Sequence, residues 1–231
     1  MIPDIQSLSM IGWMAGFAAG AVHALSGPDH LAAVAPLAVD RPSGAWRLGL
    51  RWGAGHALAV GLMGVAAVAL RGRVDVEALG AHGETAAALS LVALGLWGWR
   101  RALSRFVHVH EHEHGGVRHK HMHLHAAGIG HAHAGPHHHG HLAFGFGILH
   151  GLGGASHLLG VLPALLIPGR GQAAAYVASF GLGTLAAMAV CSGLLAAATA
   201  GAAGGARTWR WLMSGTASAS LAVGLFWLIS S

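Results

Sequence analysis

Histidines and one aspartate gather inside otherwise apolar stretches of this 231-residue chain. His23, Asp29 and His30 lie close together, and His56 follows in the next apolar stretch. Imidazole and carboxylate groups bind divalent transition metals, and a bound cation would offset the cost of a charge in a bilayer core, at least about 2.5–3.5 kcal/mol. We therefore predict a metal site at these four residues, although a single buried histidine more often serves hydrogen bonding between helices.

The second half of the chain repeats this spacing. His150 and His157 are separated like His23 and His30, while a serine, Ser156, takes the place of Asp29. We predict that the first half holds the main site. The second pair then completes that site or forms a weaker step on the same path.

Glycine and proline predict that both histidine segments are interrupted helices. Gly27 and Pro28 precede Asp29, and proline is favoured at the first position of a new helix, where a carboxylate is also favoured. Gly153 and Gly154 predict a matching break in the second half. A broken helix at membrane depth is tolerated where it lines a cavity, which is where transporters place their substrate.

Most of the 20 histidines lie in one polar segment between residues 108 and 141. Short histidine-rich tracts are typical of metal binding, and imidazole suits nickel, copper, zinc and iron. We predict many labile sites on a flexible chain, acting as a buffer, sensor or gate, and a dispensable linker is the alternative. The histidines are His108, His110, His112, His114, His119, His121, His123, His125, His131, His133, His137, His138, His139 and His141.

The composition excludes an ordinary soluble domain. The chain is 54% hydrophobic and 9% charged, against about 25% charged residues in soluble proteins. Its net charge of +5 is spread over the ends of apolar runs, which argues against a nucleic-acid partner. The single cysteine, Cys191, excludes an internal disulfide, and the first residues do not resemble a cleavable signal peptide.

We expect an all-α integral membrane protein with six transmembrane helices, the first and fourth broken near mid-membrane. We expect the protein to lie in the cell (inner) membrane. Most basic residues fall on one side of the bilayer, which predicts that both termini are outside the cell and that the middle loop is cytoplasmic. The expected spans cover residues 10–39, 53–70, 84–99, 142–167, 173–199 and 209–229.

Matching segments predict that the chain is an inverted repeat. Residues 52–56 correspond to 180–184, in the same order and at nearly the same offset as the histidine segments. Each repeat holds three spans, an odd number, so the second enters the membrane from the opposite side. The expected units are a first three-helix repeat over residues 1–107, the loop over 108–141 and a second repeat over 142–231.

These residues resemble the nickel/cobalt transporter superfamily, including its nickel–cobalt permease and nickel/cobalt efflux branches. The resemblance rests on His23-Ala24-Leu25, on Asp29-His30 and on Gly53-Ala54-Gly55-His56. It implies a membrane transporter for Ni²⁺ or Co²⁺.

The sequence as a whole predicts a secondary transporter for divalent transition metals rather than an enzyme. The resemblance implies that its substrate is Ni²⁺ or Co²⁺. We expect no permanently bound cofactor, and the expected partners are the metal ion and the lipid bilayer. A homo-oligomer is possible. Metal ligation displaces protons, so proton exchange is the natural coupling. A zinc exporter, a haem-binding electron-transfer protein and a metal-dependent intramembrane enzyme are the alternatives.

Overall fold

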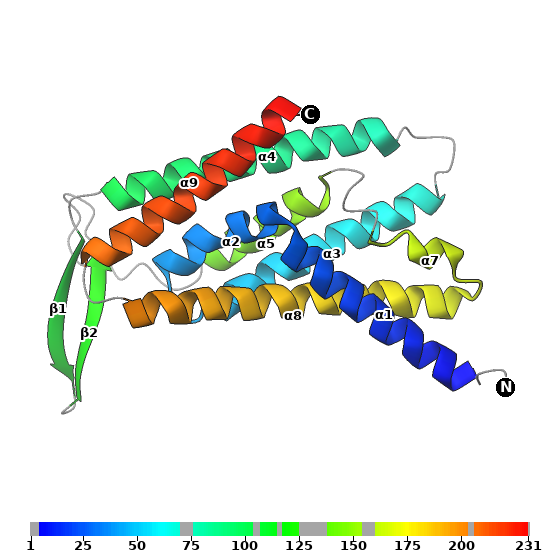
Figure 1. Ribbon diagram of the computed structural model, residues 1–231, viewed down its shortest axis with the longest axis horizontal. Coiled ribbons are helices and arrows are strands. Elements are labelled where there is room, and N and C mark those ends of the chain that lie inside the picture. The colour runs from blue at the N-terminus through cyan, green and yellow to red at the C-terminus, as the bar shows by residue number, and fades with distance from the viewer. Residues whose placement is uncertain are drawn as a thin grey trace.

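The computed structural model describes residues 5–69, 76–103, 107–114, 117–124, 138–153, 160–202 and 206–230. These residues form an elongated helical bundle with one β-hairpin (Figure 1). The helices of the first half are α1 (Ile5–Ser26), α2 (Pro28–Asp40), α3 (Ala45–Ala69) and α4 (Val76–Leu103). The hairpin is β1 (Val107–His114) and β2 (Val117–Leu124). The second half has α5 (His138–Gly151), α7 (Pro163–Leu166), α8 (Arg170–Ala202) and α9 (Ala206–Ser230).

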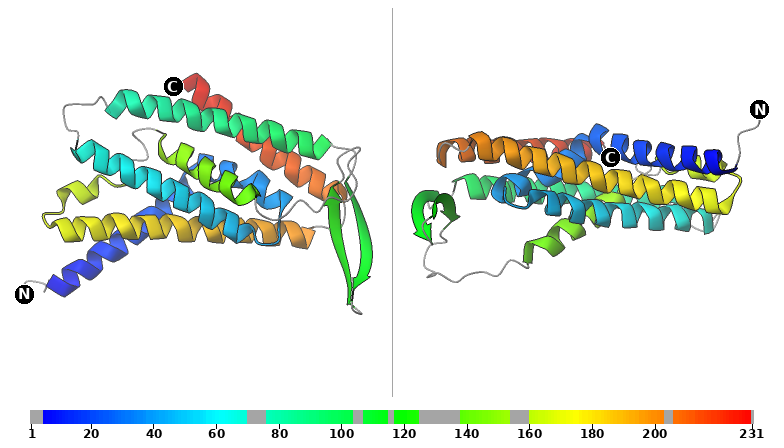
Figure 2. Two further views of the ribbon diagram at one scale, coloured as in Figure 1. Left: turned by 180° about the vertical axis from the view of Figure 1, so that it is seen from behind. Right: turned by 90° about the horizontal axis from the view of Figure 1, so that it is seen from below.

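Two pairs of long helices enclose the shorter helices α2 and α5. Helices α4 and α9 pack together along one side, and α3 and α8 pack together along the other, where α1 crosses α8. Helices α2 and α5 lie between these pairs in both the front and the back view (Figures 1 and 2). The hairpin lies at one end of the bundle, and the N-terminus and α7 lie at the other (Figure 1).

Glycines let the helices approach closely. A Cβ atom added at Gly20 of α1 would overlap the backbone carbonyl of Phe180 in α8, and one added at Gly183 would overlap the carbonyl of Phe17. Membrane helices associate largely through such close packing of small residues, because lipid offers no hydrophobic driving force between them. The Thr184 hydroxyl reinforces the crossing by donating to the Gly20 carbonyl at 3.2 Å.

Fewer candidate spans are present than the six expected. Among the described residues, α8 over Arg170–Ala200 and α9 over Arg207–Ser230 are long and apolar enough to cross a membrane. The bent pair α1–α2 becomes a third if it is one span. Helices α3 and α4 fall short over their described residues, because α3 includes Arg51 and His56 and α4 ends in two arginines.

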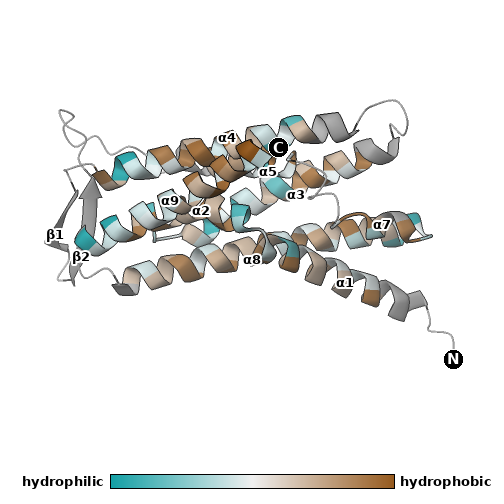
Figure 3. Ribbon diagram, turned by 45° about the horizontal axis from the view of Figure 1, so that its top comes forward, coloured by the Kyte–Doolittle hydropathy of each residue, from teal (hydrophilic) through white to brown (hydrophobic). Residues whose placement is uncertain are grey.

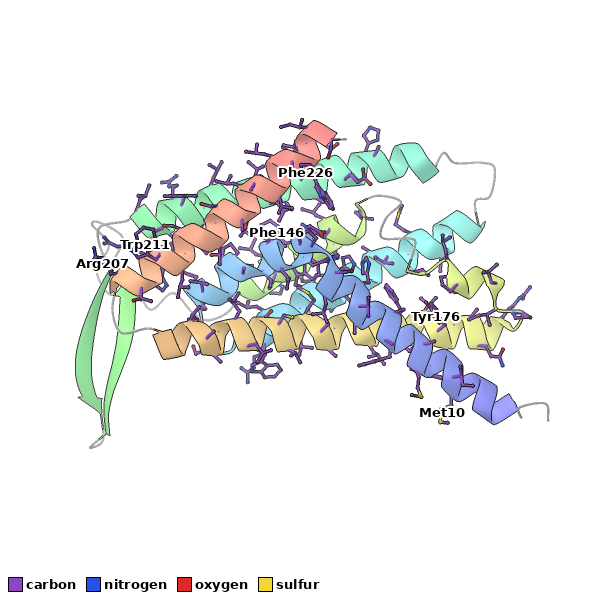
Figure 4. All side chains as sticks on the ribbon, in the orientation of Figure 1. Met10, Phe146, Tyr176, Arg207, Trp211 and Phe226 are labelled. Atoms are coloured by element: carbon purple, nitrogen blue, oxygen red, sulfur yellow. The ribbon has the colours of Figure 1, made fainter. Side chains whose placement is uncertain are left out.

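The helix surfaces nonetheless suit a lipid environment. Large apolar side chains are exposed along α1, α3, α8 and α9, including Met10, Leu62, Leu194 and Phe226. Met10 projects from α1 away from the bundle (Figure 4). Hydrophilic residues concentrate at helix ends and at the α1–α2 junction (Figure 3). Exposed apolar area on this scale is typical of a membrane or interaction surface.

The first predicted helix break is present. Helix α1 ends at Ser26 and α2 begins at Pro28, and the two helices are bent by 71°. The second predicted break lies partly outside the described residues. Helix α5 ends at Gly151, Gly153 follows it in a bend, and α7 begins at Pro163. Gly154 and His157 lie outside the described residues.

Candidate metal centre

Three of the predicted ligands meet in the interior of the bundle. His23, His30 and His56 each offer one ring nitrogen, and these nitrogens all lie within 4.8 Å of one another. The Nε2 atoms of His23 and His56 are 3.3 Å apart. The His30 ring centroid is 4.9 Å from those of both other rings. Three imidazoles from three helices therefore converge on one point.

The bend at Gly27 brings the first two histidines together. On an unbroken helix, His23 and His30 would be separated by two turns, about 10 Å of rise. The break instead puts His23 in the last turn of α1 and His30 in the first turn of α2, where its backbone N–H donates to the Gly27 carbonyl at 3.2 Å. Pro28 occupies the first position of α2 and suits it, because that position has no helical partner for an N–H.

Gly27 also leaves room for the His30 ring. A Cβ atom at position 27 would overlap His30 Nδ1 and would lie 2.7 Å from Asp29 Oδ1. The Gly27 backbone has φ −81° and ψ 107°, a conformation open to any residue. Glycine is therefore required here for space and not for backbone freedom.

Helix α3 supplies the third imidazole. His56 is fully buried, and its ring stacks on Trp52, one turn earlier, with centroids 5.1 Å apart and planes 11° apart. The Trp52 ring also meets the His30 ring edge-on at 5.3 Å. Trp52 was not among the predicted site residues, yet it is fully buried and contacts two of the three imidazoles. Its position four residues before His56 was the available signal.

Asp29 lies beside the three-histidine group rather than within it. Its Oδ1 atom is 3.4 Å from His30 Nδ1, and its Oδ2 atom is 3.9 Å from Nε2 of His150 on α5. Asp29 and His150 are buried, and the N-terminal end of α2 adds a favourable partial positive charge near the carboxylate. The Asp29 carboxylate thus lies between the three-histidine group and His150, which corresponds to His23 in the predicted repeat.

The remaining predicted ligands are distributed differently. His150 adjoins the centre, with its ring centroid 6.3 Å from that of His30. Six histidines of the middle segment lie in paired positions of the hairpin, and His114 is paired with Val117. His141 is exposed on α5, while His138 and His139 begin that helix. The predictions for His125, His131, His133, His137 and His157 fall outside the described residues.

The donor set suits a divalent transition metal. Two imidazole nitrogens bound to one zinc at 2.0–2.1 Å in tetrahedral geometry are about 3.3 Å apart, which matches the His23–His56 distance. Nitrogen ligands favour zinc, copper, nickel and cobalt over calcium or magnesium, which prefer oxygen. A carboxylate beside a ligating histidine is also the usual outer partner of such a centre.

Comparison with known proteins identifies two relatives. The "Chloroplast protein FOR GROWTH AND FERTILITY 1" of Arabidopsis thaliana is 30% identical over 190 residues, which are 80% of this chain and 50% of the relative. The "Chloroplast protein FOR GROWTH AND FERTILITY 2" is 33% identical over 174 residues, which are 75% of this chain and 44% of the relative. The chain thus spans about half the length of the curated relatives it matches. No family model and no solved structure matches it.

These relatives correct the family prediction. The resemblance to the nickel/cobalt transporter superfamily was wrong, because similarity over most of the chain leads to the chloroplast growth and fertility proteins instead. The motif that suggested it consists of a few histidine, glycine and aspartate residues. Such residues recur wherever apolar helices pack closely around a buried polar group. The relatives are chloroplast proteins, so they also do not support the expected cell-membrane location.

Proposed function

We propose that this chain is an integral membrane protein that binds a divalent transition-metal ion at His23, His30 and His56 and carries it across the bilayer. The observation that supports the proposal most directly is the convergence of three ring nitrogens within 4.8 Å at a broken helix. Interrupted helices are where membrane transporters bind ions. The proposal is of a carrier, not of an enzyme.

Asp29 has a distinct role in this proposal. Because its Oδ1 atom is close to His30 Nδ1, we assign it to orienting the His30 ring and leaving Nε2 for the ion. A neutral imidazole with its other nitrogen held by a carboxylate is a stronger ligand in a fixed orientation. The negative charge of Asp29 would also balance part of the charge of the ion within a region of low polarity.

Matched helix crossings support two inverted repeats around this centre. In the first crossing, Gly20 of α1 lies against the carbonyl of Phe180 in α8. In the second, Gly147 of α5 lies against the carbonyl of Trp52 in α3. Gly20 and Gly147 are equivalent in the proposed repeat, as are Trp52 and Phe180, so α1 meets α8 as α5 meets α3.

The reciprocal contacts of these crossings also correspond. Gly183 of α8 lies against the carbonyl of Phe17, and Gly55 of α3 lies against the carbonyl of Phe144. In the proposed repeat, Gly183 is equivalent to Gly55 and Phe17 is equivalent to Phe144. Two related bundles that meet through close, sequence-matched crossings could rock against each other, which is how inverted-repeat transporters expose a central site alternately to the two sides.

Metal binding by the full-length chain tests the first part of this proposal. All histidines from 108 to 141 are replaced by glutamine so that this segment contributes no ligands. Binding of Zn²⁺, Co²⁺, Ni²⁺ and Cu²⁺ is then measured by equilibrium dialysis with and without His56→Ala. The matched control is His82→Ala, because His82 is an exposed histidine on α4. One ion bound per chain, lost only with His56→Ala, is expected, and equal binding by the two variants would reject the centre.

Flux measurement tests the second part. The protein is reconstituted in vesicles that enclose a metal-sensitive dye, and the ions that bind are added outside. Flux that the His56→Ala change abolishes and the His82→Ala change leaves intact is expected. A protein that binds the ion but shows no flux in either direction would reject transport and leave binding in place.

A further inference from the structure

The histidine-rich segment is partly ordered as an antiparallel hairpin with a defined register. His108 is paired with His123, His110 with His121, and His112 with His119. Directly opposed residues, and residues two apart on one strand, lie on the same face of a β-ribbon. These six positions, which we call the histidine ladder, therefore occupy one face of the hairpin.

The opposite face has a different composition. It pairs Glu111 with Lys120 and Glu113 with Arg118, and its two remaining positions are apolar pairs. Opposite charges directly across a strand pair are stabilising. A slip of one residue would move every histidine of one strand to the charged face and separate these charge pairs. The sequence is therefore matched to this register.

We propose that the histidine ladder is a second metal-binding site, separate from the buried centre, in which each cross-strand histidine pair binds one borderline transition-metal ion such as Zn²⁺. Opposed residues have Cβ atoms about 4.5–5.5 Å apart, a spacing that lets two imidazoles reach one ion. A two-stranded hairpin alone is marginally stable in water, so an ion bridging the strands would also stabilise it.

The location of the hairpin gives the ladder a role in the proposed function. The hairpin lies at the end of the bundle where α4 ends and α9 begins, and Arg207 marks this end of α9 (Figures 1 and 4). Arg100 and Arg101 lie in the last turn of α4, and Arg210 is the fifth residue of α9. Basic residues mark the side of a membrane protein that is not translocated. The ladder would concentrate metal ions on that side, next to the bundle that holds the buried centre.

The test compares two variants that lose the same number of histidines. Both are made in the full-length chain with His56→Ala, which removes the buried centre, so the comparison concerns the histidine-rich segment. The first variant is His110→Gln with His121→Gln, which removes one cross-strand pair. The matched control is His114→Gln with His141→Gln, because His114 is paired with Val117 and His141 lies on α5.

Zn²⁺ binding by equilibrium dialysis separates pairing from simple histidine number. Loss of an outer partner of a metal site costs about 10–100-fold in affinity, and loss of two direct ligands costs no less. We therefore expect the first variant to lose one bound ion or to bind it at least about tenfold more weakly, with the control within about twofold of its parent. Equal losses in the two variants would overturn the ladder, because histidine number alone would then decide binding.

A composition-matched exchange gives a second test. Val109→His combined with His110→Val keeps every residue type but moves one histidine to the opposite face. This exchange should weaken Zn²⁺ binding as the variant His110→Gln with His121→Gln does. Unchanged Zn²⁺ binding would overturn the proposal. Zn²⁺ should also slow hydrogen exchange at the backbone amides of β1 and β2 in the parent protein. A hairpin whose exchange is unaffected by saturating Zn²⁺ would likewise overturn it.

Discussion

The change Gly27→Ala tests the geometry of the buried centre with a single methyl group. A Cβ atom at position 27 would lie 2.6 Å from Cε1 of His30 and 2.7 Å from Oδ1 of Asp29. Ordinary van der Waals contact begins near 3.4 Å, and Nδ1 of His30 would overlap the new Cβ more closely than Cε1 does, so the ring must move by more than 0.8 Å, the difference between 3.4 and 2.6 Å. Metal–ligand distances tolerate only about 0.2 Å, so we expect affinity to fall about 10–100-fold.

The same substitution should not destabilise the backbone. The φ and ψ angles of Gly27 suit alanine, and replacing glycine at a compatible position reduces the conformational entropy of the unfolded chain, which stabilises by about 0.4–1 kcal/mol. The methyl group also overpacks the buried site, which typically costs about 1–3 kcal/mol. We therefore expect metal affinity to fall while thermal stability changes by no more than this overpacking cost, because the backbone itself accepts alanine.

The assay is Zn²⁺ binding and thermal unfolding of the full-length chain with the histidines of 108–141 replaced by glutamine. The matched control is Gly61→Ala, because a Cβ at Gly61, five residues beyond His56 on α3, would meet nothing within 4 Å. Wild-type affinity in Gly27→Ala would refute the reasoning, since a ring displaced in this way could not remain in a metal centre.

Three further predictions concern charge and packing. The change Asp29→Asn keeps the shape of the side chain but removes the charge beside His30, and Zn²⁺ affinity measured by dialysis should fall about 10–100-fold. The change Gly20→Ala places a methyl group against the Phe180 carbonyl, and should lower stability by about 1–3 kcal/mol, measured as a lower unfolding temperature in detergent. Arg101 donates two hydrogen bonds to Asp40, at 3.0 and 3.1 Å, and joins α4 to α2. Since the arginine is partly exposed, Arg101→Gln should cost about 1 kcal/mol in the same assay, and no shift would show that the pair is fully screened.

The local features of the buried centre could be predicted from the sequence. Gly27 and Pro28 interrupt any helix through this segment, and the structure has the break there. The residue types that flank the break also indicated metal chemistry before any contact was known. The prediction of the break succeeds because proline and glycine act on the backbone within one or two residues of their own position.

The arrangement of the ligands required the tertiary structure. Spacing along the chain placed Asp29 among the ligands, whereas the fold puts it beside the group, between His30 and His150. Trp52 was missed for a related reason. Its stacking on His56 follows helical spacing, but its contact with His30 depends on how α2 packs against α3.

Hydropathy, histidine content and the helix break are properties of short segments, and they are fixed by the residues themselves. They predicted a helical membrane protein with a polar centre and a histidine-rich loop. The tertiary structure decided which imidazoles meet, which residue faces which across the hairpin, and how many helices qualify as spans. The reason is physical. A metal centre depends on distances of a few ångströms between atoms on different helices, and the chain bend and interhelical packing that set those distances are not encoded by spacing along any one segment.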